Sequence, residues 1–142
     1  MRKKSFRAIF VFCLTIMLSV STAGSVFAGT AVPSTVWNLS TQGKDDIAGT
    51  SNYVNIYSSY LYTGSSLISF DFENHSTYSL KVTLMKKNPI PLFADTEIWS
   101  TTLSNYMSSV ISAKDVSASD KFYFKFSSTT GSIDVVGGVW GR

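Results

Sequence analysis

A strict alternation of apolar and polar side chains constrains the fold of this chain more than any other feature of its sequence. Ile68, Phe70 and Phe72 share one parity, and the residues between them are polar or charged. The stretch KFYFKF at 121–126 repeats this pattern with phenylalanine at every second position. Successive side chains of an extended strand point to opposite faces, so a period of two predicts half-buried β-strands at both places.

A third alternating stretch, at 80–85, follows the first after the turn-prone segment 74–77. Two alternating strands separated by a short polar turn predict a β-hairpin. In such a hairpin Lys81 would lie opposite Asp71 or Glu73, depending on the register, and would form an ion pair on the outer face.

Shorter strand candidates complete an all-β pattern. They lie at 36–40, 52–62, 95–101 and 132–140. Gly137-Gly138 predicts a bulge or tight bend in the last of them. Residues 88–91 (NPIP) interrupt any strand, because proline lacks a backbone donor. About seven or eight short strands without alternating helices predict an antiparallel two-sheet β-sandwich, jelly-roll-like or Ig-like, with a small β-barrel as the alternative.

Residues 103–114 carry a competing helical pattern. Their apolar members have the spacing of an amphipathic helix: Leu103, Tyr106, Met107, Val110 and Ile111. The serines and β-branched residues in this segment are mediocre or poor helix formers. We therefore favour a strand near 107–112, with a short helix at 103–114 as the alternative.

The first 28 residues have the layout of a secretory signal peptide, with a basic start, an apolar run at 8–20 and small residues before Gly29. We expect cleavage after Ala28, with Ala23 as the weaker alternative, and a secreted, extracellular protein. Residues 29–142 would then form a single β-sandwich domain. The apolar run is short for a membrane span, and no second long apolar segment follows, so we expect no transmembrane segment in the mature chain.

Removal of the signal peptide changes the charge and the redox chemistry of the chain. The only cysteine, Cys13, would be lost, so the mature protein would be free of disulfides. Eight Lys and Arg residues would remain against nine Asp and Glu residues, a net charge of −1. The basic residues are scattered rather than gathered in a stripe, which argues against binding to nucleic acid.

Residues that could carry catalysis are few. His75 is the only histidine and lies in a polar turn, with no cysteine in the mature chain to form a dyad. We interpret Asp71 and Glu73 as surface charges rather than a glycosidase pair. The acidic doublet Asp45-Asp46 supplies too few oxygens for calcium. The sequence therefore predicts a protein that is not an enzyme and that has no metal site and no cofactor.

Four of the seven tyrosines lie between residues 53 and 62, in a stretch without a charged residue. If the strand bulged at Ser58-Ser59, all four would align on one face. Aromatic faces with amide and hydroxyl neighbours suit the binding of sugar rings. The candidate ligand-binding residues are therefore Tyr53, Asn55, Tyr57, Tyr60 and Tyr62. In the alternative interpretation, these tyrosines are ordinary strand residues divided between core and surface.

Two functional classes fit these observations. The first is an extracellular binding module for a glycan or another cell-wall or cell-surface polymer. The second is a secreted bacteriocin-like or toxin-like effector that acts on a cell envelope. A toxin should expose an apolar patch, whereas a glycan module should keep a polar surface lined by aromatic side chains.

Overall fold

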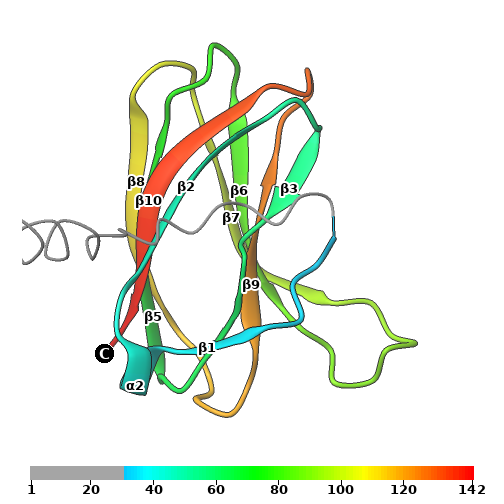
Figure 1. The fold of residues 1–142 in the computed structure, drawn as a ribbon, viewed down its shortest axis with the longest axis vertical. Helices are drawn as coiled ribbons and strands as arrows, with labels where there is room; N and C mark the ends of the chain where they lie inside the picture. The colour runs from blue at the N-terminus through cyan, green and yellow to red at the C-terminus, as the bar shows by residue number, and fades with distance from the viewer. Residues whose placement is uncertain (1–30) are drawn as a thin grey trace, which may run out of the picture.

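The computed structural model describes residues 31–142, which form two sheets packed face to face (Figure 1). The predicted all-β sandwich is confirmed, and the sheets do not close into a barrel. The predicted signal peptide and its cleavage site lie outside the described residues. Among residues 31–142, no helix has the length and apolar character needed to cross a membrane.

The first sheet has four antiparallel strands. In spatial order they are β2 (Asp45–Ser51), β10 (Ile133–Gly141), β5 (Leu67–Asn74) and β8 (Ser108–Asp115). The second sheet has six strands. Its main path is β1 (Val36–Asn38), β4 (Leu61–Thr63), β9 (Phe122–Ser127), β6 (Leu80–Lys86) and β7 (Thr96–Leu103), and β3 (Asn55–Tyr57) also pairs with β9. Only β1 and β4 among the paired strands are parallel. A single helical turn, α2 (Leu39–Gln42), follows β1.

The alternating phenylalanines of the two sheets meet in the core. Phe70 and Phe72 of β5 and Phe124 and Phe126 of β9 are fully buried. The ring of Phe72 lies 4.8 Å from Phe124 and 5.1 Å from Phe126, edge to face. Such pairs add to the stabilisation from burial, so the predicted inward faces of both strands are confirmed.

The predicted hairpin of residues 68–85 is wrong, because β5 and β6 belong to different sheets. β5 pairs with β10 and β8, which leaves it no free edge for β6. Lys81 accordingly contacts Glu97 of β7 at 3.5 Å, not Asp71 or Glu73. The segment between the two strands crosses from one sheet to the other, an arrangement that local alternation cannot distinguish from a hairpin.

The segment 103–114 contains β8, so the strand favoured for this region is confirmed and the helical alternative is wrong. Tyr106 and Met107 form the turn before β8 with φ of 48° and 58°. These left-handed values are incompatible with a right-handed helix. The side chains at this turn are largely exposed, Tyr106 at 63% and Met107 at 66%. The apolar spacing therefore combines the last residue of β7, two turn residues and two residues of β8.

The glycine pair of β10 does not form a bulge. β10 pairs in an unbroken register with β2 on one side and β5 on the other. A side chain at Gly137 would collide with the backbone oxygen of Asp71 and with Phe72. The glycine therefore permits close approach of two strands, which is the other common reason for glycine inside a strand. A register shift does occur elsewhere, between β6 and β7 at Leu84/Met85.

Candidate functional site

The four clustered tyrosines do not form one aromatic strip. Tyr62 is fully buried, and its hydroxyl donates to Asp45 Oδ2 at 2.7 Å. Burial and the neighbouring Asp45 carboxylate raise the pKa of Tyr62 well above its usual value. Tyr60 is half-buried, with its ring 5.0 Å from that of Trp37. Both side chains therefore pack in or against the core and are poor candidates for ligand contact.

Asn55 and Tyr57 lie on β3, beside the long strand β9. Tyr57 packs its ring 5.9 Å from that of Tyr123, and Asn55 accepts a hydrogen bond from Ser127 Oγ at 2.8 Å. The strand ends after Tyr57, because Ser58 turns inward and exchanges hydrogen bonds with the backbone of Phe124. Tyr53 is the member of the cluster that is largely exposed, at 61%.

Four loops meet at one end of the sandwich, which is uppermost in Figure 1. They are residues 52–54, 75–79, 104–107 and 128–132, and we call this surface the loop end. Two direct backbone hydrogen bonds join these loops in pairs. Tyr106 N donates to Ser76 O at 3.0 Å, and Ser128 N donates to Val54 O at 2.9 Å. His75 N also donates to Asp134 O of β10 at 2.8 Å, so the loops form one supported surface.

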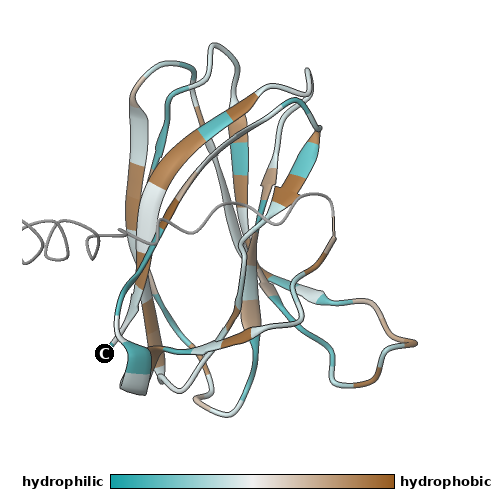
Figure 2. Cartoon of the chain, viewed as in Figure 1, coloured by the Kyte–Doolittle hydropathy of each residue, from teal (hydrophilic) through white to brown (hydrophobic). Residues whose placement is uncertain are grey.

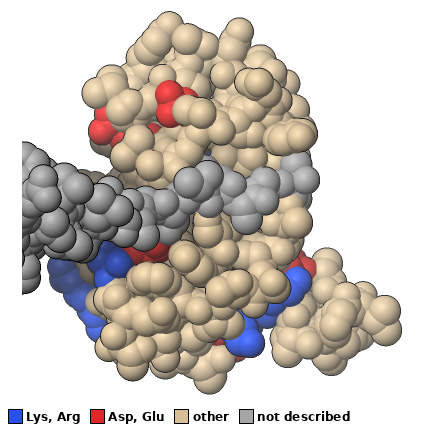
Figure 3. All heavy atoms as spheres, viewed as in Figure 1, with Lys and Arg blue, Asp and Glu red and all other residues tan. Residues whose placement is uncertain are grey.

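The loop end is rich in exposed tyrosine and contains no Lys, Arg, Asp or Glu. Tyr53, Tyr78 and Tyr106 come from three of the four loops and are 61%, 45% and 63% exposed. The other loop residues are mostly Ser, Thr and Asn, which offer both donors and acceptors. The upper end of the face seen in Figure 3 shows no Lys or Arg.

One buried side chain, Asn74 at the end of β5, connects two of these loops. Its Nδ2 donates to the backbone oxygens of Tyr78 and Ser104, each at 2.8 Å. Its Oδ1 accepts from Ser76 N at 3.0 Å and from Ser76 Oγ at 2.7 Å. Both atoms of the amide are thus satisfied by loop groups, which fixes loops 75–79 and 104–107 relative to each other.

Backbone conformation also presents side chains at the loop end. Tyr106 and Met107 have left-handed φ, which is unfavourable for residues other than glycine. The amide of Met107 donates to Asn74 O at 2.8 Å and helps to hold the turn in place. The result is that a tyrosine and a methionine are exposed at positions where glycine would adopt the backbone conformation without strain.

The remaining candidates from the sequence are placed on the four-stranded sheet. Asp71 and Glu73 line a hollow of about 270 Å³ on its outer face, together with Ser109, Ile111 and other residues of β5, β8 and β10. Glu73 contacts His75 Nε2 at 3.1 Å. Within residues 31–142, no group of three or more His, Cys, Asp or Glu side chains is arranged to hold a metal ion.

Comparison of the chain with protein-family models and with curated proteins gave no match.

Proposed function

We propose that this chain is a secreted, non-catalytic binding module for a glycan or another cell-wall or cell-surface polymer, and that the loop end is its binding surface. The observation that carries the proposal is the exposure of three tyrosines on joined loops that lack charged Asp, Glu, Lys and Arg side chains. A neutral, polyhydroxylated ligand suits such a surface, because its C–H faces stack on aromatic rings and its hydroxyls need donors and acceptors.

The composition of the loop end supports this assignment. Loops rich in Tyr, Ser, Asn and Gly also form antibody paratopes, where tyrosine supplies a large contact area at low conformational cost. The hydrogen bonds of Asn74 add pre-organisation, because less loop entropy is lost on binding when the loops are already fixed. Of the residues predicted from the sequence, Tyr53 belongs to this surface.

Substitution of each exposed tyrosine tests the proposal. Purified protein is incubated with insoluble peptidoglycan, chitin and cellulose, and the retained fraction is measured. We expect retention on at least one of them and expect Tyr53→Ala, Tyr78→Ala and Tyr106→Ala each to weaken it between about twofold and tenfold, the range for an aromatic contact. Their melting temperatures should stay close to that of the parent protein.

Tyr57→Ala is the matched comparison, because Tyr57 lies on β3 rather than in a loop. If Tyr57→Ala abolishes retention and the three loop variants do not, the outer face of the six-stranded sheet is the binding surface and the loop end is not. If none of the four substitutions changes retention, both surfaces are excluded.

Secretion is the second part of the proposal and has its own test. The protein recovered from the culture medium should begin at Gly29, as mass spectrometry of the intact chain would show. A chain that keeps residues 1–28, or that is found only in cells, would contradict the proposed export.

The second functional class, a bacteriocin-like or toxin-like effector, is favoured by an exposed apolar loop between β6 and β7. Growth inhibition or dye leakage in neighbouring cells treated with the purified protein would favour this class over a binding module.

A further inference from the structure

An apolar loop, residues 87–95, projects from the sandwich between β6 and β7 (Figure 1). Three of its side chains are largely exposed: Ile90 at 51%, Leu92 at 94% and Phe93 at 62%. Figure 2 shows that hydrophobic residues occupy its tip. Exposed apolar residues scattered singly are ordinary, but several gathered on one projection indicate an interaction surface.

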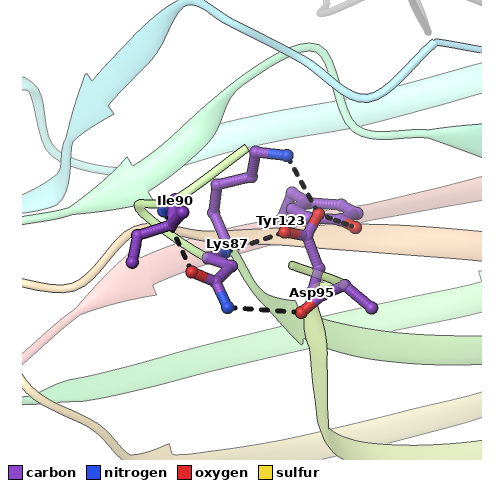
Figure 4. A network of polar contacts seen from close by, with 6 residues as sticks. Lys87, Ile90, Asp95 and Tyr123 are labelled. Atoms are coloured by element: carbon purple, nitrogen blue, oxygen red, sulfur yellow. Dashed lines mark hydrogen bonds and ion pairs between the residues drawn. The ribbon is translucent and has the colours of Figure 1, made fainter. Parts of the chain in front are cut away.

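A polar clamp holds the base of the apolar loop (Figure 4). Asp95 Oδ2 accepts from Lys87 Nζ at 3.1 Å and from the hydroxyl of Tyr123 at 2.8 Å. Asp95 Oδ1 accepts from the backbone amide of Asn88 at 2.8 Å. The clamp therefore ties both ends of the loop to each other and to β9.

The loop above the clamp has a fixed shape of its own. Ile90 N donates to Asn88 Oδ1 at 3.0 Å, and Phe93 N donates to Ile90 O at 3.1 Å (Figure 4 shows the first of these bonds). Pro89 and Pro91 restrict the backbone further, since each ring fixes φ. None of these contacts uses the side chains of Leu92 or Phe93, so the loop displays apolar groups that its own fold does not need.

The base of the apolar loop has an excess of one positive charge. Lys86, Lys87 and Lys121 adjoin it, against Asp95 and Asp120. Both carboxylates already form ion pairs, Asp120 with Lys86 and Asp95 with Lys87. Figure 3 shows Lys and Arg atoms, with Asp or Glu atoms next to them, beside the uncharged projection.

A hollow of about 490 Å³ lies beside the base and combines apolar and charged groups. Pro89 and Pro91 line it, as do Lys87, Lys121 and Asp120. The projection therefore has apolar side chains at its tip, and lysines with two paired carboxylates at its base. That order matches the depth profile of a bilayer, in which hydrocarbon lies below the phosphates of the headgroups.

We propose that the apolar loop inserts into the surface of a lipid bilayer, with Ile90, Leu92 and Phe93 among the acyl chains and Lys121 facing anionic headgroups. This goes beyond the proposed polymer binding and uses a different surface of the molecule. β6 runs from the loop end to the apolar loop, so the two surfaces lie at opposite ends of this strand, and the apolar loop projects sideways from the sandwich (Figure 1). The protein could then hold a polymer and a membrane at the same time.

A fluorescent label at the tip tests this directly. An environment-sensitive fluorophore is attached to the exported protein carrying Cys13→Ser and Leu92→Cys, and vesicles of equal parts phosphatidylcholine and phosphatidylglycerol are added. We expect emission at position 92 to move to shorter wavelength and to become quenched by lipids labelled in their acyl chains. A label at Thr129→Cys, which lies at the loop end, should show neither change.

Each other result of this experiment overturns the proposal. If the protein binds vesicles but the label at position 92 stays in water, another segment makes the contact. If the emission shifts without vesicles and in proportion to protein concentration, a second copy covers the apolar loop. If the protein does not bind the vesicles, the loop is not a membrane anchor.

Substitutions measure the contribution of each group. Leu92→Ser combined with Phe93→Ser should lower the vesicle partition coefficient by at least about tenfold, as loss of one buried apolar side chain would. Ile111→Ser is the matched control, because Ile111 is 79% exposed but lies on β8. Lys121→Gln should weaken binding about fivefold on the anionic vesicles and leave binding to pure phosphatidylcholine unchanged. Equal loss in Ile111→Ser would show that general surface hydrophobicity, not the loop, causes binding.

Discussion

Asn74 is the residue on which the loop end depends most directly. Its buried amide makes all four of its hydrogen bonds to groups in two loops. Asn74 follows an alternating strand and begins the polar segment 74–77, so the sequence predicts a turn here. What the sequence does not show is that this turn joins two sheets, where an amide can bridge loops that are distant along the chain.

We predict that Asn74→Ala destabilises the protein by about 3 kcal/mol, because the Ser76 amide would lose a buried partner and the Tyr78 and Ser104 carbonyls would each lose a part-buried one. The free energy of unfolding in urea measures this directly. Asn105→Ala is the control, since Asn105 is exposed in the neighbouring loop, and it should change stability by less than about 0.5 kcal/mol. Equal effects of the two substitutions would show that the amide network is not what holds the loops.

Tyr123 shows that the alternation of residues along a strand does not by itself predict burial. It alternates with the inward phenylalanines of β9 and so points to the outer face, as expected, yet it is only 3% exposed. The clamp of the apolar loop and the ring of Tyr57 cover it. Parity predicts which face of a strand a residue occupies. Burial on an outer face depends instead on whether other segments of the chain pack over that face.

At the scale of elements, the sequence predicts strands better than their partners. β5, β6, β8 and β9 were expected close to where they occur, because alternation is local and each strand shows it without its neighbours. The predicted pairing of β5 with β6 was wrong. A hairpin and a crossover between two packed sheets both bury the same alternate apolar residues, so the pattern cannot distinguish them. The glycine pair of β10 was likewise ambiguous, since a bulge and a close strand approach both require small residues.

The two glycines of β10 provide a matched test of that assignment. Gly137→Ala should destabilise the protein by about 2 kcal/mol or more, because its new methyl group would press on the backbone of Asp71 and on Phe72. Gly138→Ala would meet chiefly the exposed side chain of Lys44, which can move, and should cost about 1 kcal/mol or less. Thermal unfolding of both variants would reveal the difference. A larger loss for Gly138→Ala would contradict the observed strand packing.

The clamp of the apolar loop is a second prediction at this scale. Partial burial acts to raise the pKa of Asp95, but hydrogen bonds from Asn88, Tyr123 and Lys87 outweigh it and lower the pKa. We expect Asp95→Ala to speed hydrogen exchange of the amides in residues 88–94 and to cost about 1 kcal/mol, the ordinary net value of a hydrogen bond to a partly exposed group. Asp115→Ala, on the exposed edge of β8, is the control and should leave that exchange unchanged.

Acid should open the same clamp in the parent protein. Because the folded pKa of Asp95 lies below its unfolded value, its contribution to stability is present above the unfolded pKa and is lost as the pH falls through the folded pKa. The protection of the amides in residues 88–94, taken relative to their intrinsic exchange rates at each pH, should therefore fall in acid before the sandwich unfolds. An unchanged exchange pattern down to global unfolding would show that Asp95 does not close the loop.

At the scale of the whole molecule, the two candidate surfaces could be predicted only in part. The sequence shows the density of tyrosine at 53–62. It does not show that Tyr62 is buried in the core and that Tyr60 packs on Trp37, which removes both from the candidate surface. Tyr78 and Tyr106 join Tyr53 at the loop end only because two crossovers bring their loops to one end of the sandwich. The NPIP segment was predicted to interrupt a strand, which is correct, but its projection depends on the clamp to Tyr123 from a distant strand.

The pH dependence of global stability is the last prediction, and it follows from the two buried tyrosine–carboxylate pairs. Burial and the carboxylates of Asp45 and Asp95 raise the pKa values of Tyr62 and Tyr123 above the ordinary value for tyrosine. A group with a raised folded pKa contributes stability below its unfolded pKa, about 10 for tyrosine, and that stability is lost as the pH rises further. Above this pH the unfolded chain binds fewer protons than the folded protein, so the free energy of unfolding should fall by about 1.4 kcal/mol per pH unit for each of the two tyrosines.

Urea unfolding at a series of alkaline pH values measures this slope. Tyr123→Phe should remove the contribution of one tyrosine and make the slope shallower, although it also lowers stability at neutral pH by breaking the bond to Asp95. Tyr53→Phe, which removes a hydroxyl from an exposed side chain, is the variant with which the slope of Tyr123→Phe is compared. A slope that is the same in Tyr123→Phe and the parent protein would show that Tyr123 does not keep its proton in the folded state, and the clamp would then need another explanation.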